Sequence, residues 1–358
     1  MGKTGRKLTS LLFISSLLVT AVGCGGGQGN ETAAQPEGNK DTVASNGIQE
    51  RKIKLGIGLN EDHPEAFGAR KFKEIVEEKT AGKIKVDLFY SNTLGDDQKM
   101  AEALKGGLQE LTVISTSPLA PTVKEFGIFD FPFVFNTGEE ADAVLDGPVG
   151  QAVLDKLPEQ GWIGLAYWEN GFRNLTNSKH PVEKLEDFAG LKIRTMQNQV
   201  HLDVFKALGA NPTPMAFSEL FTAMESKAID GQENPFPTIE SNKFNEVQTY
   251  LSVTNHVYTP FIFLAGKPFW DKLSDEEKQI LQEAAKEAGK VERQLNREQS
   301  IKSLENLKAA GMKVNEVAAE EKARIQEAIK PVIDKYSKEL GEDLVKQMYE
   351  EVEKLRNK

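Results

Sequence analysis

Two arginines and one asparagine give this chain the side chains needed to hold a carboxylate. Arg194 ends a predicted strand at residues 190–194, and Arg173 lies in the segment 170–177. A guanidinium binds a carboxylate through two parallel hydrogen bonds, which lysine cannot do, and Asn234 supplies both a donor and an acceptor. Ligands of α/β sheets bind in the crevice at strand ends. The pattern therefore predicts an anion site, with a salt bridge or a turn as the structural alternative for each residue.

Other chemistries lack the residues that they need. Cys24 is the only cysteine, which leaves no intrachain disulfide and no thiol nucleophile in the folded part of the chain. The four histidines are far apart in sequence and lack metal-ligand spacing: His63, His180, His201 and His256. The sequence contains no HExxH, GxSxG or phosphate-binding P-loop motif. We therefore expect neither a metal nor a cofactor.

The overall charge is acidic. Lys plus Arg number 44 and Asp plus Glu number 54, which gives a net charge of −10. This balance argues against nucleic-acid binding. It does not argue against an anionic ligand, because a local cationic pocket can outweigh the global sign.

The amino terminus has the pattern of an export signal. Lys3, Arg6 and Lys7 precede a mostly apolar run at residues 11–22, which is too short to span a hydrocarbon core of about 30 Å. Small residues then lead to Cys24, as in a bacterial lipoprotein attachment site. We expect residues 1–23 to be a lipoprotein signal peptide, the alternative being an ordinary secretory signal with an incidental cysteine. Two or more acyl chains on Cys24 would anchor the protein stably.

Residues 24–50 are rich in Gly, Gln, Asn, Glu and Thr, a composition that cannot bury enough surface to fold and that predicts a flexible tether. The remaining chain, about 310 residues, exceeds a usual single core, so we expect two lobes.

Short apolar runs alternate with amphipathic stretches, which predicts an α/β sheet. The expected strands are 53–57, 84–89, 111–114, 161–168 and 191–194, and the expected helices are 66–79, 97–105, 199–208 and 218–227, the last with Ser218 as N-cap. A capping box at 274–277 begins a helical stripe that continues toward Gly311, and Pro331 opens or interrupts the tail. The phenylalanine-rich segment 126–135 is expected to pack in the core or between lobes.

Together, these segments resemble the DctP-type solute receptors of tripartite ATP-independent periplasmic (TRAP) transporters. The resemblance runs from Leu55 through the tail, and its most specific stretches are 94–97, 190–194, 212–217 and 230–235. It implies two α/β lobes of a periplasmic-binding-protein-like fold, joined by hinge strands and crossed by a long helix. The expected boundaries are 51–170 with 260–299 for the first lobe and 171–259 with 300–358 for the second.

The resemblance also assigns roles to residues. Arg194 would pair with the ligand carboxylate, and Arg173 would be a second cationic contact. Asn234 would hydrogen-bond the carboxylate or a neighbouring oxygen, and Phe217 would pack on the ligand body. Two residues fall where the first lobe lines the cleft in such receptors: Asn60 and Asp97.

One segment departs from part of the family. In sialate-type relatives the loop after the third strand tends to present an acidic residue, whereas residues 115–117 are Ser-Thr-Ser here. This disfavours a nine-carbon sugar acid and favours a C4-dicarboxylate or a uronate-type sugar acid. Trp168, Glu169 and His201 are candidates for tuning that choice, with packing or a solvated surface as the alternative for Trp168 and His201.

The expected function is an extracytoplasmic receptor, not an enzyme, that closes on an organic acid anion and delivers it to an ion-coupled permease. We expect a monomer, anchored to the membrane through Cys24, on a cell surface or in a periplasm. Two alternatives stay open: a ligand-sensing partner of a membrane signalling protein, and a carboxylate lyase or isomerase on the same fold. The sequence leaves the identity of the acid undecided.

Overall fold

A computed structural model describes residues 47–357 of the chain. The expected signal peptide, Cys24 and most of the expected tether lie outside the described residues. The last tether residues lie within them, and the backbone N–H of Gln49 donates to the Glu277 carboxylate at 2.9 Å.

One mixed sheet of nine strands organises residues 47–357, in the order β2-β1-β3-β8-β4-β7-β5-β6, with β9 paired to β8. The strands are β1 (Arg51–Ile57), β2 (Ile84–Phe89), β3 (Leu111–Ser115), β4 (Trp162–Asn177), β5 (Lys192–Thr195), β6 (Asn211–Pro214), β7 (Gly231–Asn234), β8 (Tyr250–Gly266) and β9 (Lys313–Glu316). Strands β1 to β3 run parallel in the first lobe, and β5 to β7 run parallel in the second. The prediction of an α/β fold is confirmed.

Two long antiparallel strands, β4 and β8, connect the lobes. The carboxyl-terminal part of β8 pairs with β3, while its beginning pairs with β9. Strand β4 ends beside β7, and its register against β8 shifts at three places, one of them between Glu169 and Gly171. Such irregularities bend strands, which fits the hinge strands expected between the lobes.

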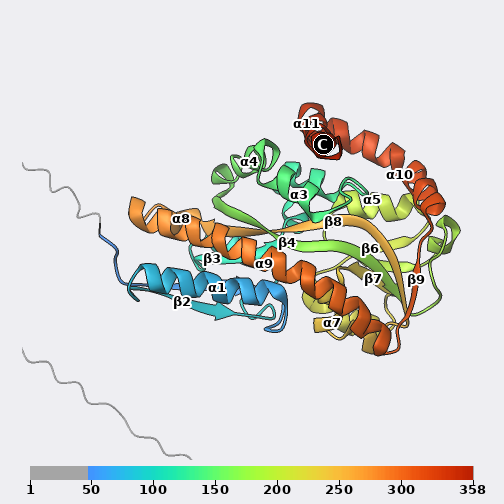
Figure 1. The fold of residues 1–358 in the computed structure, drawn as a ribbon, viewed down its shortest axis with the longest axis horizontal. Helices are drawn as coiled ribbons and strands as arrows, with labels where there is room; N and C mark the ends of the chain where they lie inside the picture. The colour runs from blue at the N-terminus through green and yellow to red at the C-terminus, as the bar shows by residue number, and fades with distance from the viewer. Residues whose placement is uncertain (1–46, 358) are drawn as a thin grey trace, which may run out of the picture. The chain divides into compact units, whose positions relative to one another are not determined.

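Helices pack on the sheet from both sides. They are α1 (Pro64–Lys79), α2 (Asp97–Lys105), α3 (Gly138–Leu145), α4 (Pro148–Leu154), α5 (Gln199–Ala207), α6 (Leu220–Glu225), α7 (Phe236–Ser241), α8 (Lys267–Trp270), α9 (Asp275–Ala309), α10 (Ala319–Leu340) and α11 (Glu342–Arg356). Figure 1 shows α9 running diagonally across β4 and β8, with α1 beside its first half and α7 beside its second. The prediction of a long helix over both lobes is confirmed.

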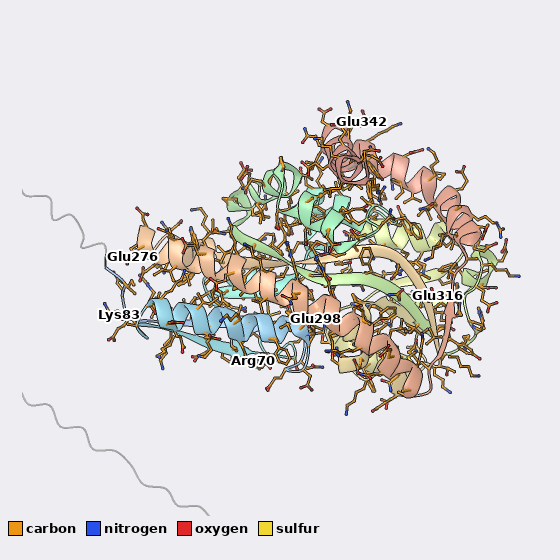
Figure 2. All side chains as sticks on the ribbon, viewed as in Figure 1. Arg70, Lys83, Glu276, Glu298, Glu316 and Glu342 are labelled. Carbon is orange, nitrogen blue, oxygen red and sulfur yellow. The ribbon has the colours of Figure 1, made fainter. Side chains whose placement is uncertain are left out.

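The start of α9 follows from its sequence. The Ser274 side chain accepts from the Glu277 backbone N–H at 3.2 Å, and the Glu277 carboxylate accepts from the Ser274 N–H at 2.8 Å. This reciprocal pair is the predicted capping box. One face of the helix is buried, and the other carries exposed charges such as Glu276 and Glu298, labelled in Figure 2.

The phenylalanine-rich segment lies in the core, as predicted. Part of it forms a 3-10 turn, Lys124–Asp130. Four of its rings are buried in the largest apolar cluster: Phe126, Phe129, Phe131 and Phe135. Side chains of α3, α4, α5, α10 and α11 belong to the same cluster. Two smaller clusters lie under α1 with the first half of α9, and around α6 and α7.

Three local predictions differ from the structure. Ser218 does not cap a helix, because a 3-10 turn at Phe217–Glu219 precedes α6 and α6 has no side-chain cap. Pro331 lies inside α10 and does not end it. Helix α11, in the tail expected with the second lobe, packs on α3 and α4, which lie in the range expected for the first.

Candidate functional site

A cleft between the lobes gathers polar side chains from both sides. It encloses about 530 Å³ of space, part of it open to solvent. Its first-lobe wall comes from the end of β1, the start of α1, the start of α2 and the end of β3. Its second-lobe wall comes from β5, the turn before α6, β7 and α7. The charged and amide residues of the lining are Glu65, Asp96, Asp97, Asn170, Arg194, Gln197 and Asn234.

Arg194 is the cation of this cleft. It lies in β5, is 2% exposed, and its Nε and Nη2 donate to the Met215 carbonyl at 3.0 and 2.8 Å. Its Nη1 has no hydrogen-bond partner within residues 47–357. Burial and the nearby charge of Arg173 lower the pKa of Arg194 to about 10, so the group stays charged at neutral pH. A fixed guanidinium with a free buried N–H is ready to receive an anion.

Arg173 lies behind this wall and is not part of the cleft lining. It is fully buried in β4, where its guanidinium binds the Glu233 carboxylate, with an Nη2–Oε1 distance of 3.0 Å, and donates to Asn234 Oδ1 at 3.1 Å. Its Nη1 also lacks a partner in the described part of the chain. The structure thus gives Arg173 an ion pair behind the cleft wall, rather than a place in the lining.

Glu233 is held ionised by this arrangement. Burial alone would raise the pKa of its carboxyl, but Arg173 and the His256 ring, 3.3 Å away, together lower the pKa well below its usual range. The Arg173–Glu233 pair is therefore a buried charge pair, in which each charge is stabilised by the opposite charge of the other residue.

Asn234 and Phe217 both line the cleft, where they were expected. Asn234 is oriented by its neighbours, since its Oδ1 accepts from Arg173 and its Nδ2 donates to Gln232 Oε1. Phe217 leans against Phe244, with ring centroids 5.9 Å apart, and gives the cleft an apolar side. The structure brings these two residues together with Arg194 and Asp97.

Asp97 belongs to the opposite wall. It follows the N-cap Asp96 at the start of α2, and its Oδ2 accepts from the Ser115 backbone N–H at 3.3 Å. Burial raises the pKa of Asp97 to about 7, against smaller opposite effects of the Ser115 N–H and the Arg194 charge. The carboxyl is thus poised to titrate near neutral pH.

This titration predicts a pH-dependent affinity. A bound anion favours the neutral form of Asp97, so binding takes up protons and is tighter below pH 7 than above it. We expect the dissociation constant to rise between pH 6 and pH 8, by up to about tenfold for each pKa unit by which the ligand shifts Asp97. Calorimetry across this range measures the effect. Asp97→Asn should flatten the profile, and an affinity of the wild type that stays constant over the range would contradict the prediction.

Asn60 does not line the cleft. Its Nδ2 donates to the Ser241 carbonyl at 2.7 Å, at the end of α7. Nearby, the buried His63 ring contacts Thr238 Oγ1 at 3.1 Å, and burial lowers the pKa of His63 to about 3. These contacts join the segment before α1 to α7, so Asn60 connects the lobes at the edge of the cleft.

Trp168 is a core residue in this structure. Its indole N–H donates to the Ala285 carbonyl at 2.9 Å, and its ring packs edge-on against Phe263. A Cβ added to Gly289 or Gly68 would come within 2.6 Å of the ring. The tuning role expected of Trp168 is therefore not supported by its position. The other two candidates also lie outside the lining, with Glu169 bound to Arg297 and His201 to Asp130.

Sequence reasoning missed Glu65, which lines the cleft from the first turn of α1. An acidic residue at the beginning of a helix is favoured by the helix dipole. A glutamate at this position therefore does not by itself indicate a binding role. Ser115 and Asn170 also lie in the lining, although the sequence analysis gives neither of them a contact with the ligand.

Two α/β lobes, a pair of connecting strands and a cleft with a fixed arginine define an extracytoplasmic solute-binding receptor. The family comparison agrees: the model of the bacterial extracellular solute-binding proteins, family 7 (DctP), matches residues 55–339. The chain belongs to this family and is a solute-binding receptor of a TRAP transporter. The family serves transport, so the lyase or isomerase alternative is not supported.

Relatives of known structure or name cover most of the chain. The sugar acid binding protein DctPAm of Advenella mimigardefordensis, solved with galactonate, is 46% identical with a TM-score of 0.84 and covers 86% of this chain and 99% of its own. The 2,3-diketo-L-gulonate-binding protein YiaO of Escherichia coli is 36% identical over 76% of this chain and 83% of its own. The C4-dicarboxylate-binding protein DctB of Bacillus subtilis is 32% identical over 87% and 91%.

No helix within residues 47–357 is both long and apolar enough to cross a membrane. No group of three or more His, Cys, Asp or Glu side chains in that range could hold a metal ion.

Proposed function

We propose that this receptor captures a small organic acid anion, a C4-dicarboxylate or a uronate-type sugar acid, and delivers it to an ion-coupled TRAP permease. The observation that carries the proposal is the Arg194 guanidinium, which is buried in the cleft, held by the Met215 carbonyl, and has no partner for its Nη1 among residues 47–357. A carboxylate satisfies this donor and neutralises the charge. The relatives support an organic acid as the ligand, since they are described as binding galactonate, diketogulonate or C4-dicarboxylates.

In the proposed cycle, the ligand carboxylate binds Arg194 on the second lobe, and the first lobe closes over it by bending β4 and β8. Closure removes water, which strengthens each charged contact in the cleft. The ligand shifts the open and closed populations only by its preference for the closed form. The contacts of Asn60 and His63 with α7 are then made only when the lobes are closed.

We also propose where the two lobes divide and how the protein is held at the membrane. Lobe boundaries lie near residues 170, 260 and 300, where β4, β8 and α9 pass between the lobes. A monomer is tied to the membrane through a lipid on Cys24, and residues 24–46 set its reach above the bilayer. Mass spectrometry of the mature amino-terminal peptide checks the lipid, and an unmodified cysteine would contradict it.

The test of the ligand class is a thermal-shift screen of dicarboxylates, uronates, aldonates and keto acids. A ligand at about 100 times its dissociation constant stabilises the folded state by about 2.7 kcal/mol, so the midpoint rises visibly. Neutral sugars and amines of similar size are the controls. The proposal fails if only these controls raise the midpoint.

A further inference from the structure

Glu65 is a buried acidic residue of the cleft that lacks the partners expected of a structural carboxylate. It is 1% exposed, it lines the cleft, and neither of its carboxyl oxygens makes a hydrogen bond of good geometry within the described chain, although the Leu59 backbone N–H lies near enough to lower its pKa slightly. Buried carboxyls usually have partners, because an unsatisfied buried polar group is costly. A ligand that fills the cleft is the partner that would satisfy both oxygens.

The burial of Glu65 is built into the packing of α1. One turn later, Gly68 lets α1 approach α9 so closely that an added Cβ would lie 2.8 Å from the Cβ of Glu292. The helix start is fixed by His63, whose Nδ1 accepts from the Glu65 backbone N–H at 3.1 Å. The Glu65 side chain lies buried beside α9, close enough for Glu292 to raise its pKa, and it lines the cleft.

The charges of the cleft are divided between its walls. Arg194 is the cation in the lining, and Arg173 lies behind it on the same side. The opposite wall carries Glu65, Asp96 and Asp97. A second carboxylate on a ligand held by Arg194 would thus meet acids rather than a second cation.

Hydroxyl groups fit this acidic wall better than a carboxylate does. A hydroxyl donates to a carboxylate when Glu65 or Asp97 is ionised, and it can both donate and accept when either is protonated. Burial, together with the charges of Asp97 and Glu292, raises the pKa of Glu65 well above its usual range, against a smaller lowering by the Leu59 backbone N–H. A carboxylate can only accept, and it would leave the carbonyl oxygen of a protonated carboxyl unsatisfied.

We infer that Glu65 is a specificity-determining residue that selects a polyhydroxylated monocarboxylate, a sugar acid with one carboxylate at Arg194 and hydroxyls at Glu65 and Asp97, over a C4-dicarboxylate. This inference rests on the proposed function and narrows its ligand to one class. Asp97 contributes from the start of α2, where its Oδ1 would be 3.2 Å from a Cβ added to Gly58; the glycine leaves that oxygen accessible.

The test is calorimetry of the full mature receptor with galactonate, galacturonate and succinate at one pH. The wild type should bind at least one of the two sugar acids more than tenfold more tightly than succinate. Glu65→Leu should weaken that sugar acid by at least tenfold and change succinate binding by less than threefold, so that the preference collapses. Glu65→Gln keeps a donor and an acceptor and should retain most of the preference.

Controls separate this role from a structural one. Glu74→Leu removes an exposed acid of the same helix, paired with Lys71, and should leave all affinities unchanged. The thermal midpoint of ligand-free Glu65→Leu should equal or exceed that of the wild type, because an unpartnered buried carboxyl is removed. A wild type that prefers succinate, or Glu65→Leu with unchanged sugar-acid affinity, overturns the inference and leaves the proposed function standing. Binding of no organic acid at all overturns the proposed function itself.

Discussion

Replacing Arg194 with alanine is expected to abolish ligand binding while the protein stays folded. The change removes the cation of the cleft lining and the free Nη1 that would receive the carboxylate. Loss of one partner of a buried charged hydrogen-bond pair costs about 2 to 5 kcal/mol or more, which corresponds to a loss of affinity of roughly 30-fold to several thousand-fold. Calorimetry with a ligand found in the thermal-shift screen measures the loss.

The folded state of this variant is the essential control. The ligand-free protein loses a buried positive charge whose hydrogen bonds within residues 47–357 go to the Met215 carbonyl, so its unfolding midpoint should change little. Arg194→Lys keeps the charge without the forked geometry, and its affinity should lie between those of the wild type and the alanine variant. An unchanged affinity in Arg194→Ala would remove this residue from the ligand site.

Replacing Arg173 with methionine has its largest effect on stability. Glu233 then stays buried without its cation, and breaking a buried pair from one side destabilises by about 3 to 5 kcal/mol. Chemical denaturation of the ligand-free receptor should show this loss, whereas Arg194→Ala should not. The two arginines, both expected from the sequence to contact the ligand, are thereby separated into a residue of the buried ion pair and a residue of the cleft.

The matched control is the double variant Arg173→Met with Glu233→Gln. It removes both charges, and it should recover a large part of the lost stability, since replacing a whole buried pair costs far less than breaking it. If Arg173→Met unfolds with the free energy of the wild type, the ion pair contributes nothing, and Arg173 acts only through its free Nη1.

The elements with strong local patterns were predictable from sequence. The helix at 97–105 and the strand at 84–89 have the predicted bounds, and the capping box of α9 is made as expected. Strand β8 was not predicted, and β4 only in its first half. The second half of β4 contains Arg173 and other polar residues that are buried by strands distant in sequence, so no local periodicity marks it.

The site was predictable where a residue type implies its chemistry. Arg194, Asn234, Phe217 and Asp97 all line the cleft. The positions of Trp168 and Glu65 were not predictable, because both depend on how closely α1 approaches α9. Gly68 lets α1 approach Glu292 of α9 and the Trp168 ring, and Gly289 lets α9 approach the same ring. Residues 68 and 292 are more than 200 positions apart in the sequence.

The way β8 and α9 complete the first lobe governs the order in which the chain can fold. Strand β3 pairs with residues 261–265, and α1 packs on the first half of α9, so strands β1 to β3 cannot complete their core until the first half of α9 has been made. Contacts of such long range slow folding, since loop-closure entropy is lost before the contacts form. The first lobe should therefore stay incomplete until most of the chain has emerged, which leaves time for export across a membrane before the lobes assemble.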